Sequence, residues 1–167
     1  MTPVGTIDAI CRFLGETLKN LRPDEKKVTI YPYSLPDPDP AAMMRDSGEA
    51  PVTYVGMMPA VIVVPISFED KLFEDGTSLL TVSLLAGAYS HDHEEGPLCV
   101  INILERVRRL LLTNRILEDA CEVQEPLNWQ MYDAGTKPLW FGEMITHWRI
   151  AVPDRVDFED WKGDLNF

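Results

Sequence analysis

The sequence has few cysteines, few basic residues and no long apolar run. Its three cysteines, Cys11, Cys99 and Cys121, form no CxxC pair, and their odd number does not favour a disulfide framework. We expect all three to be buried free thiols in a reducing compartment. The apolar run at 59–66 is far too short to cross a membrane, and residues 1–5 lack the pattern of a signal peptide. These features predict a protein of the cytoplasm.

Basic residues are the minority among the charged residues. The chain has 15 Lys and Arg against 27 Asp and Glu, which gives a formal net charge of −12. Neutralisation of phosphates supplies most of the affinity of a nucleic-acid binder, so such proteins usually carry a basic surface. The acidic balance therefore argues against specific nucleic-acid binding. An acidic surface would repel a nearby nucleic-acid duplex and so prevent nonspecific binding.

The motifs that usually mark an enzyme are also missing. The sequence contains no glycine-rich phosphate loop, no Walker-type lysine and no dinucleotide fingerprint. Its paired carboxylates, such as Asp37 with Asp39 and Glu159 with Asp160, lie in segments that look exposed, whereas acid–base catalysis needs a desolvated carboxyl group. We therefore expect no catalytic residues, no cofactor and no metal.

One polar loop, at 90–96, could suggest chemistry. Neighbouring residues of an extended chain point apart, so Ser90, His91 and Asp92 cannot form a catalytic triad by themselves. We expect a solvated loop. The alternative is a metal-dependent hydrolase that uses His91, His93 and the only other histidine, His147.

Two segments have the apolar spacing of an amphipathic helix. The first covers 7–21, with Thr6 as the predicted N-cap and Pro23 as the residue that ends the helix. The second covers 97–113, where Pro97 fits the first helical turn. On its polar face Glu105 and Arg109 have the spacing of an i, i+4 ion pair.

Several segments favour β-structure because their residues are β-branched, aromatic or alternating in polarity. The predicted strands lie at 27–33, 59–68, 77–89 and 139–152, with two shorter strands around Val123 and Trp129 and a hairpin turn at 134–136. Residues 34–58 form a long excursion in which proline alternates with aspartate, a pattern that removes ladder donors. We predict one α+β domain at 1–152, with a mainly antiparallel sheet flanked by two helices, and an acidic, aromatic tail at 153–167.

Aromatic side chains are frequent in the last third of the chain, where they stand next to charged residues. Aromatic residues are enriched at the centres of protein interfaces. The arginines of the second helix could form a solvated face with internal ion pairs or, alternatively, salt bridges between subunits. The residues predicted at an interface with another subunit or a partner are Arg106, Arg109, Trp140, Phe141, Phe158, Trp161 and Phe167.

Five segments follow one another in an order that resembles the tail terminator proteins of bacteriophages and phage-tail-like particles. They are the strand Pro59-Ala60-Val61-Ile62-Val63, the helix Asn102-x-x-Glu105-Arg106-Val107-Arg108-x-Leu110, the motifs Pro126-Leu127-x-Trp129 and Pro138-x-Trp140-Phe141-Gly142-Glu143, and the strand end Trp148-x-Ile150. The resemblance covers roughly 59–152. It assigns nothing to 34–58 or to the tail.

The resemblance implies a mixed sheet flanked by helices and a homo-hexameric ring that caps the tail tube and joins it to the head or collar. The partners would be other copies of the chain, the tube protein, and sheath and collar or connector proteins. The subunit would be assembled in the cytoplasm of a bacterial host and become part of a phage tail or a tail-like bacteriocin. A head–tail connector or a baseplate adaptor of the same kind of particle is the alternative.

Overall fold

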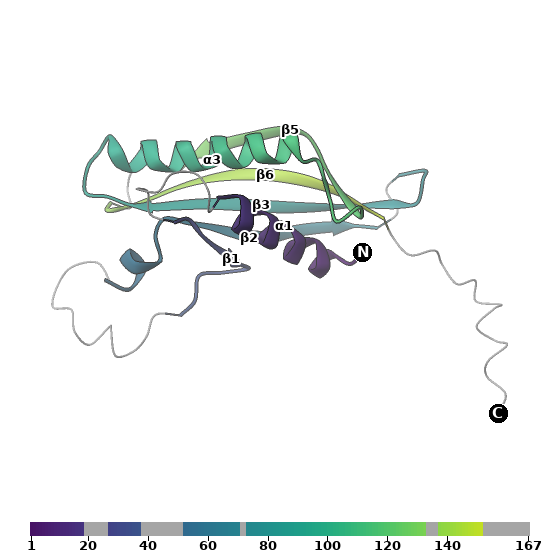
Figure 1. Cartoon of the computed structure of the whole chain (residues 1–167), viewed down its shortest axis with the longest axis horizontal. Coiled ribbons are helices and arrows are strands. Elements are labelled where there is room, and N and C mark those ends of the chain that lie inside the picture. The colour runs from purple at the N-terminus through teal and green to yellow at the C-terminus, as the bar shows by residue number, and fades with distance from the viewer. Residues whose placement is uncertain (19–26, 38–51, 71–72, 133–136, 152–167) are drawn as a thin grey trace, which may run out of the picture.

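Six strands form one curled sheet in the order β1-β2-β3-β6-β5-β4. The computed structural model describes residues 1–18, 27–37, 52–70, 73–132 and 137–151. Along the chain the elements are α1 (Pro3–Thr17), β1 (Thr29–Pro32), the 3-10 helix η2 (Val52–Met57), β2 (Ala60–Glu69), β3 (Thr77–Tyr89), α3 (Glu95–Thr113), β4 (Ile116–Leu117), β5 (Cys121–Met131) and β6 (Leu139–Ala151). All neighbouring strands are antiparallel except β1 and β2 (Figure 1). The predicted α+β class is confirmed.

Helix α1 begins one turn earlier than the sequence analysis predicted. Its N-cap is Thr2, whose hydroxyl oxygen accepts a hydrogen bond from the Gly5 N–H at 3.1 Å, and Pro3 takes the first helical position. Thr6, the predicted N-cap, lies inside the helix, fully buried, and its hydroxyl donates to the Thr2 carbonyl at 3.1 Å. The predicted end of the helix at Pro23 lies outside the described residues.

Helix α3 also begins before its predicted start, at Glu95 rather than Pro97. Asp92 closes the turn that leads into it: one oxygen, Oδ1, accepts the N–H groups of Glu94 at 2.7 Å and Glu95 at 3.0 Å. These hydrogen bonds hold the pKa of Asp92 below its usual value. The polar loop therefore has a structural use, since it satisfies donors that a helix leaves unpaired at its first turn.

The strands confirm most of the predicted pattern and correct part of it. Strand β3 covers the predicted 77–89, and β1 is shorter than the predicted 27–33. The two short strands expected around Val123 and Trp129 are one strand, β5, whose register against β6 shifts between Gln124 and Asn128. The short strand β4 and the helix η2 were not predicted. The predicted turn at 134–136 lies outside the described residues.

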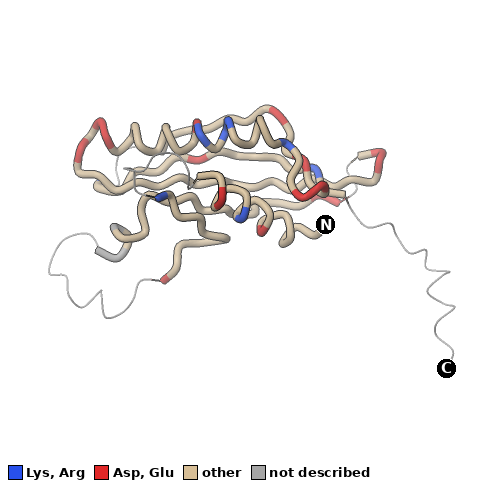
Figure 2. The backbone as a smooth tube through the Cα atoms, in the orientation of Figure 1, with Lys and Arg blue, Asp and Glu red and all other residues tan. Residues whose placement is uncertain are grey.

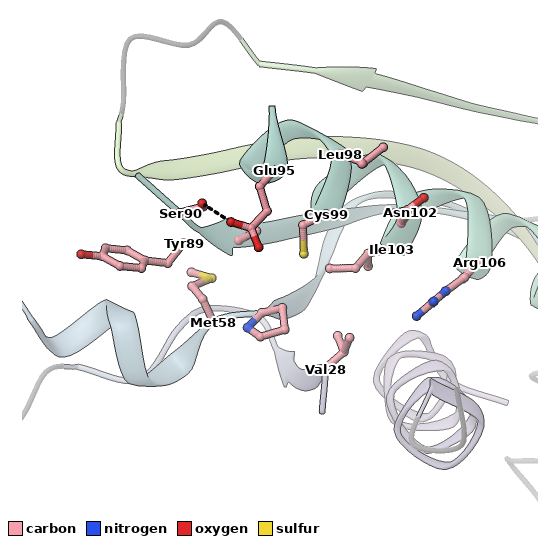
Figure 3. A pocket seen from close by; sticks show the side chains of 12 residues that line it. Val28, Met58, Tyr89, Ser90, Glu95, Leu98, Cys99, Asn102, Ile103 and Arg106 are labelled. Atoms are coloured by element: carbon pink, nitrogen blue, oxygen red, sulfur yellow. Dashed lines mark hydrogen bonds between the residues drawn. The ribbon is translucent and has the colours of Figure 1, made fainter. Parts of the chain in front are cut away.

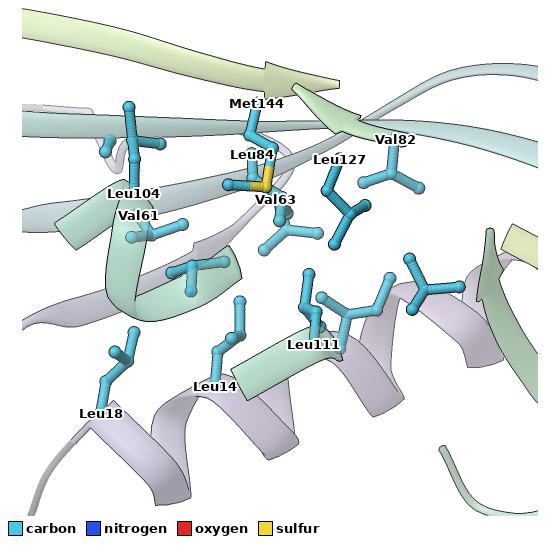
Figure 4. Close-up of a cluster of buried hydrophobic side chains, with 14 of the residues drawn as sticks. Leu14, Leu18, Val61, Val63, Val82, Leu84, Leu104, Leu111, Leu127 and Met144 are labelled. Carbon is cyan, nitrogen blue, oxygen red and sulfur yellow. The ribbon is translucent and has the colours of Figure 1, made fainter. Parts of the chain in front are cut away.

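The core lies between both helices and a single face of the sheet. Along β6 buried and half-buried residues alternate, as expected for a sheet with one packed face. Helix α3 packs on β3, β5 and β6, whereas α1 packs on β1, β2 and β4. The buried side chains shown in Figure 4 include Leu14, Leu18, Val61, Val63, Val82, Leu84, Leu104, Leu111, Leu127 and Met144.

The sheet curls around the helices, so that α1 reaches both of its edges. β1 and β4 are the two outermost strands, yet α1 contacts both of them. On the β4 side, Arg12 of α1 forms an ion pair with Glu118. Both side chains are largely exposed, so this pair contributes little to stability. Buried apolar contacts are what hold the curl closed, since each fully buried Leu or Ile side chain stabilises by about 1.5–3 kcal/mol.

No helix within the described residues is long and apolar enough to cross a membrane.

Candidate functional site

A groove lies beside the first half of α3, where the helix faces the segments that lead into β1 and β2. Its volume is about 450 Å³. Its floor is made of the buried apolar residues Val28, Ala88 and Ile103, and Met58 and Pro59 line its edge. Figure 3 shows Cys99 and Ile103 projecting from α3 towards Met58 and Val28. The rim is open, and on it Leu98 is 56% exposed.

Charged groups border this groove along α3. Glu95 lines one end and Arg106 the other. Arg109, one turn further along the same side of the helix, is exposed. Figure 2 shows the basic residues on the second half of α3 and the acidic ones in the loop before it. The groove therefore passes from an acidic end to a basic end.

The predicted ion pair of Glu105 with Arg109 is wrong. One carboxylate oxygen of Glu105 lies 3.6 Å from Nη1 of Arg108, three residues away, and the other accepts the indole N–H of Trp129 at 2.7 Å. Glu105 thus links α3 to Trp129 of β5 by a hydrogen bond. The side chain of Arg109 is exposed to solvent.

The three histidines do not converge. His91 contacts the Tyr89 hydroxyl at 2.9 Å, and His93 contacts Nζ of Lys137 at 3.4 Å. His147 lies on β6 opposite Thr81, eight residues from the end of β3 where the other two lie. At about 3.4 Å per residue that separation is roughly 27 Å. Within the described residues no group of three His, Cys, Asp or Glu side chains could hold a metal ion. This geometry gives the hydrolase alternative no support.

The sheet face turned away from α1 and α3 is only partly covered. At one end Met58 packs against it: a Cβ on Gly87 would lie 2.8 Å from Met58 Sδ and 2.9 Å from Cε1 of Phe141. Along the rest of this face the side chains of β3 and β6 are mostly half-exposed, and they include Leu79 and Ile145. Apolar side chains that lie together on an incompletely covered face, rather than singly, are typical of a surface that binds another molecule.

A hydrogen-bonded group lies on the same face around Glu143. Its carboxylate accepts hydrogen bonds from the hydroxyls of Ser83 and Tyr132. These bonds favour the charged form, so the pKa of Glu143 is lowered, and the same carboxylate raises the pKa of the Tyr132 hydroxyl. The group joins β3, β6 and the end of β5 across the sheet.

At the far end of the sheet Arg149 holds the hairpin between β2 and β3. Its guanidinium lies over the ring of Phe73, 4.4 Å from the centroid, and forms an ion pair with Asp75. Its Nε–H donates to the Thr77 hydroxyl at 2.8 Å. Asp75 also accepts from the Thr77 backbone and hydroxyl, and these bonds hold its pKa below the usual value. Through these contacts Arg149 stabilises the position of the hairpin against β6.

No disulfide joins the three cysteines, as predicted, and only Cys121 of the three is buried. Cys11 and Cys99 are half-buried, which corrects the expectation that all three are buried. Burial raises the pKa of Cys11 and of Cys121 to about 11. Both thiols are therefore protonated at neutral pH and react slowly.

The predicted interface residues fall into three groups. Arg106 and Phe141 are half-buried, and Arg109 is exposed. Trp140 is 5% exposed and belongs to the core of its own chain, with its indole N–H donating to the Ser90 carbonyl at 2.9 Å, so the expectation of an exposed anchor is corrected. The other three, Phe158, Trp161 and Phe167, lie outside the described residues.

Sequence reasoning missed the groove and the Glu143 group. A pattern signal existed for Trp140, because it shares its parity along the strand with Met144 and Trp148, both of which face the core. Nothing in the local sequence indicates the groove, since its walls come from separate segments at 28, 58–59 and 88–106.

Neither models of known protein families nor curated proteins match this sequence.

Proposed function

We propose that the protein is a structural subunit that assembles with its own copies into a ring, the hexameric cap of a phage tail tube or of a tail-like particle. The proposal starts from the order of motifs that resembles tail terminators. In such a particle the ring would contact the tube protein on one side and sheath, collar or connector proteins on the other.

The observation that carries the proposal is the incompletely covered sheet face of β3 and β6. Both strands are 13 residues long, and the residues that point away from the helices include leucine, isoleucine and phenylalanine. A monomer gains nothing from leaving such side chains half-exposed, whereas a neighbouring subunit that covers them removes apolar area from water. The half-exposed face of β3 and β6 therefore favours a protein that functions by associating with other subunits.

The two edges of the sheet, at β1 and β4, differ from each other, and a ring requires such a difference between the two surfaces of a subunit. On one side β1 pairs with β2 only up to Val63, and the rest of β2 carries Pro65, a register shift and the exposed Ile66 and Phe68. On the other side β4 pairs with only two residues of β5. A closed ring of more than two copies needs two different complementary surfaces on each subunit. Two unlike sides supply that kind of asymmetry.

The test is the copy number and the position of the subunit in its particle. We expect mass photometry of the purified full chain, over a range of concentrations, to show a hexamer, and electron microscopy of labelled particles to place one ring at the end of the tube. A different copy number in the particle would exclude the hexamer. A position at the baseplate or inside the head–tail junction would favour the adaptor or the connector.

A further inference from the structure

The groove beside α3 has the chemistry of a binding site for a short acidic segment with aromatic side chains. Its floor is apolar and its rim carries the exposed Leu98. Arg109 extends its basic end into solvent. Aromatic side chains bury a large area at low entropic cost, and carboxylates would be attracted by the arginine.

The chain itself contains a segment of this composition. Residues 153–167 include three aromatic side chains, Phe158, Trp161 and Phe167. They also include five acidic residues (Asp154, Asp157, Glu159, Asp160 and Asp164) against two basic ones (Arg155 and Lys162), a side-chain charge of 2 − 5 = −3. The sign of this charge is complementary to the basic end of the groove.

We propose that residues 153–167 of one copy bind in the groove of a neighbouring copy. This inference rests on the proposed self-assembly, and it names the contact that links one subunit to the next. The groove and the tail are different surfaces, so the contact is heterologous, and repetition of it closes a ring when the rotation between subunits permits.

For Phe158, chain length favours the groove of a neighbouring copy over the groove of its own copy. One end of the groove is lined by Tyr89, which pairs with Leu139 at the start of β6. Strand β6 ends at Ala151, twelve residues further along. Figure 1 shows this end of β6 at the opposite end of the molecule from the start of α3. At about 3.4 Å per residue Leu139 and Ala151 are about 40 Å apart. Phe158 follows Ala151 by seven residues and reaches at most about 25 Å, which is too short for it to reach Cys99, one turn into α3, within its own copy.

Cys99 provides a direct test, because it is a half-buried thiol that lines the groove. The full chain with Phe158→Cys is prepared in two isotopic forms, the forms are mixed and allowed to assemble, and a short thiol-specific cross-linker is added. Mass spectrometry then identifies the linked peptides. We expect links from position 158 to Cys99 in which the two peptides carry different isotopes. The Cys99→Ser version should lose them, and Cys11 and Cys121 serve as internal controls.

Links within one isotopic form only would overturn the neighbouring-copy contact, and so would links to Cys11 or Cys121 in place of Cys99. Copies that assemble without any link to Cys99 would overturn the groove contact and leave the ring proposal standing. A chain that stays monomeric at every concentration and in the particle would overturn both proposals.

A pair of matched variants checks the groove without cross-linking. Leu98 and Ile116 are exposed to similar extents, 56% and 60%, but Ile116 lies on β4, outside the groove. We expect Leu98→Asp to weaken assembly at least tenfold, while Ile116→Asp leaves it within about twofold and both variants keep the melting temperature of the parent. Equal assembly of the two variants would contradict the proposal.

Discussion

Gly96 and Trp140 are in such close contact that no side chain fits between them. A Cβ on Gly96 would lie 2.2 Å from Nε1 of Trp140 and 2.3 Å from its Cδ1. The indole N–H of the same tryptophan donates to the Ser90 carbonyl at 2.9 Å. The first turn of α3, the end of β3 and the start of β6 are therefore fixed to one another. Tyr89, Ser90 and Glu95, from two of these segments, line one end of the groove.

Gly96→Ala should destabilise the protein by about 2 kcal/mol or more, because the new methyl group would displace a buried indole from a well-packed site. Thermal unfolding followed by tryptophan fluorescence measures the loss. Gly56→Ala is the control, since a Cβ there meets no atom within 4 Å. Equal melting temperatures for the two variants would show that the junction can relax at no cost.

The Glu143 carboxylate should make stability depend on pH. Its pKa is lowered in the folded state, so its contribution is present above the usual value of 4.5 and is lost as the pH falls through the lower folded pKa. Glu143→Gln keeps the shape but weakens the bonds from Ser83 and Tyr132, and we expect a loss of about 1 kcal/mol at pH 7.

The difference between parent and Glu143→Gln should shrink as the pH is lowered from 7 to 3, which urea unfolding at each pH measures. Glu69→Gln, on the exposed end of β2, is the control, and we expect no change there. A difference that stays constant with pH would mean that the charge of Glu143 does not contribute.

The sequence predicts the elements well where apolar periodicity is strong. The segments at 77–89 and 97–113 bury one stripe against the sheet, and their spacing of apolar side chains follows from that burial. The start of α1 was missed although Thr2 before Pro3 is a signal for an N-terminus. Thr6 competes with it, because it too precedes apolar residues. Only packing decides that Thr6 is buried inside the helix.

Contacts and exposure of single side chains were harder to predict from the sequence than the helices and strands were. Trp140 was predicted at an interface from composition alone, but its place in the core depends on the contact with Gly96. The partner of Glu105 could not be predicted either. The choice between Arg108 and Arg109 depends on Trp129, which reaches the carboxylate from another strand. Such contacts join residues far apart in the chain, so no local pattern contains them.

His91 and His93 should contribute no chemistry. Both side chains are exposed, and the contacts of His91 with Tyr89 and of His93 with Lys137 are solvent-accessible. The double change to Ala should leave the melting temperature and assembly nearly as in the parent, with less than about 0.5 kcal/mol lost per residue. Asp92→Ala in the same loop should lower the melting temperature more than the histidine changes do, because it removes the acceptor for two N–H groups at the start of α3. Stoichiometric metal in the parent that disappears in the histidine variant would contradict this prediction.

Trp161→Ala should separate assembly from folding. If the indole is an anchor between subunits, its removal costs about 2 kcal/mol of association free energy, which is roughly a 30-fold rise in the dissociation constant. The melting temperature measured under dissociating conditions should not change, because the tail would not belong to the core of its own chain.

Lys162→Ala, at the next position, is the matched control, and we expect an effect below about twofold. Analytical ultracentrifugation and differential scanning calorimetry of the three full-length proteins measure the two quantities. Unfolding of Trp161→Ala at a lower temperature would place the tail in its own domain, and unchanged assembly would show that the tryptophan is only a solvated residue.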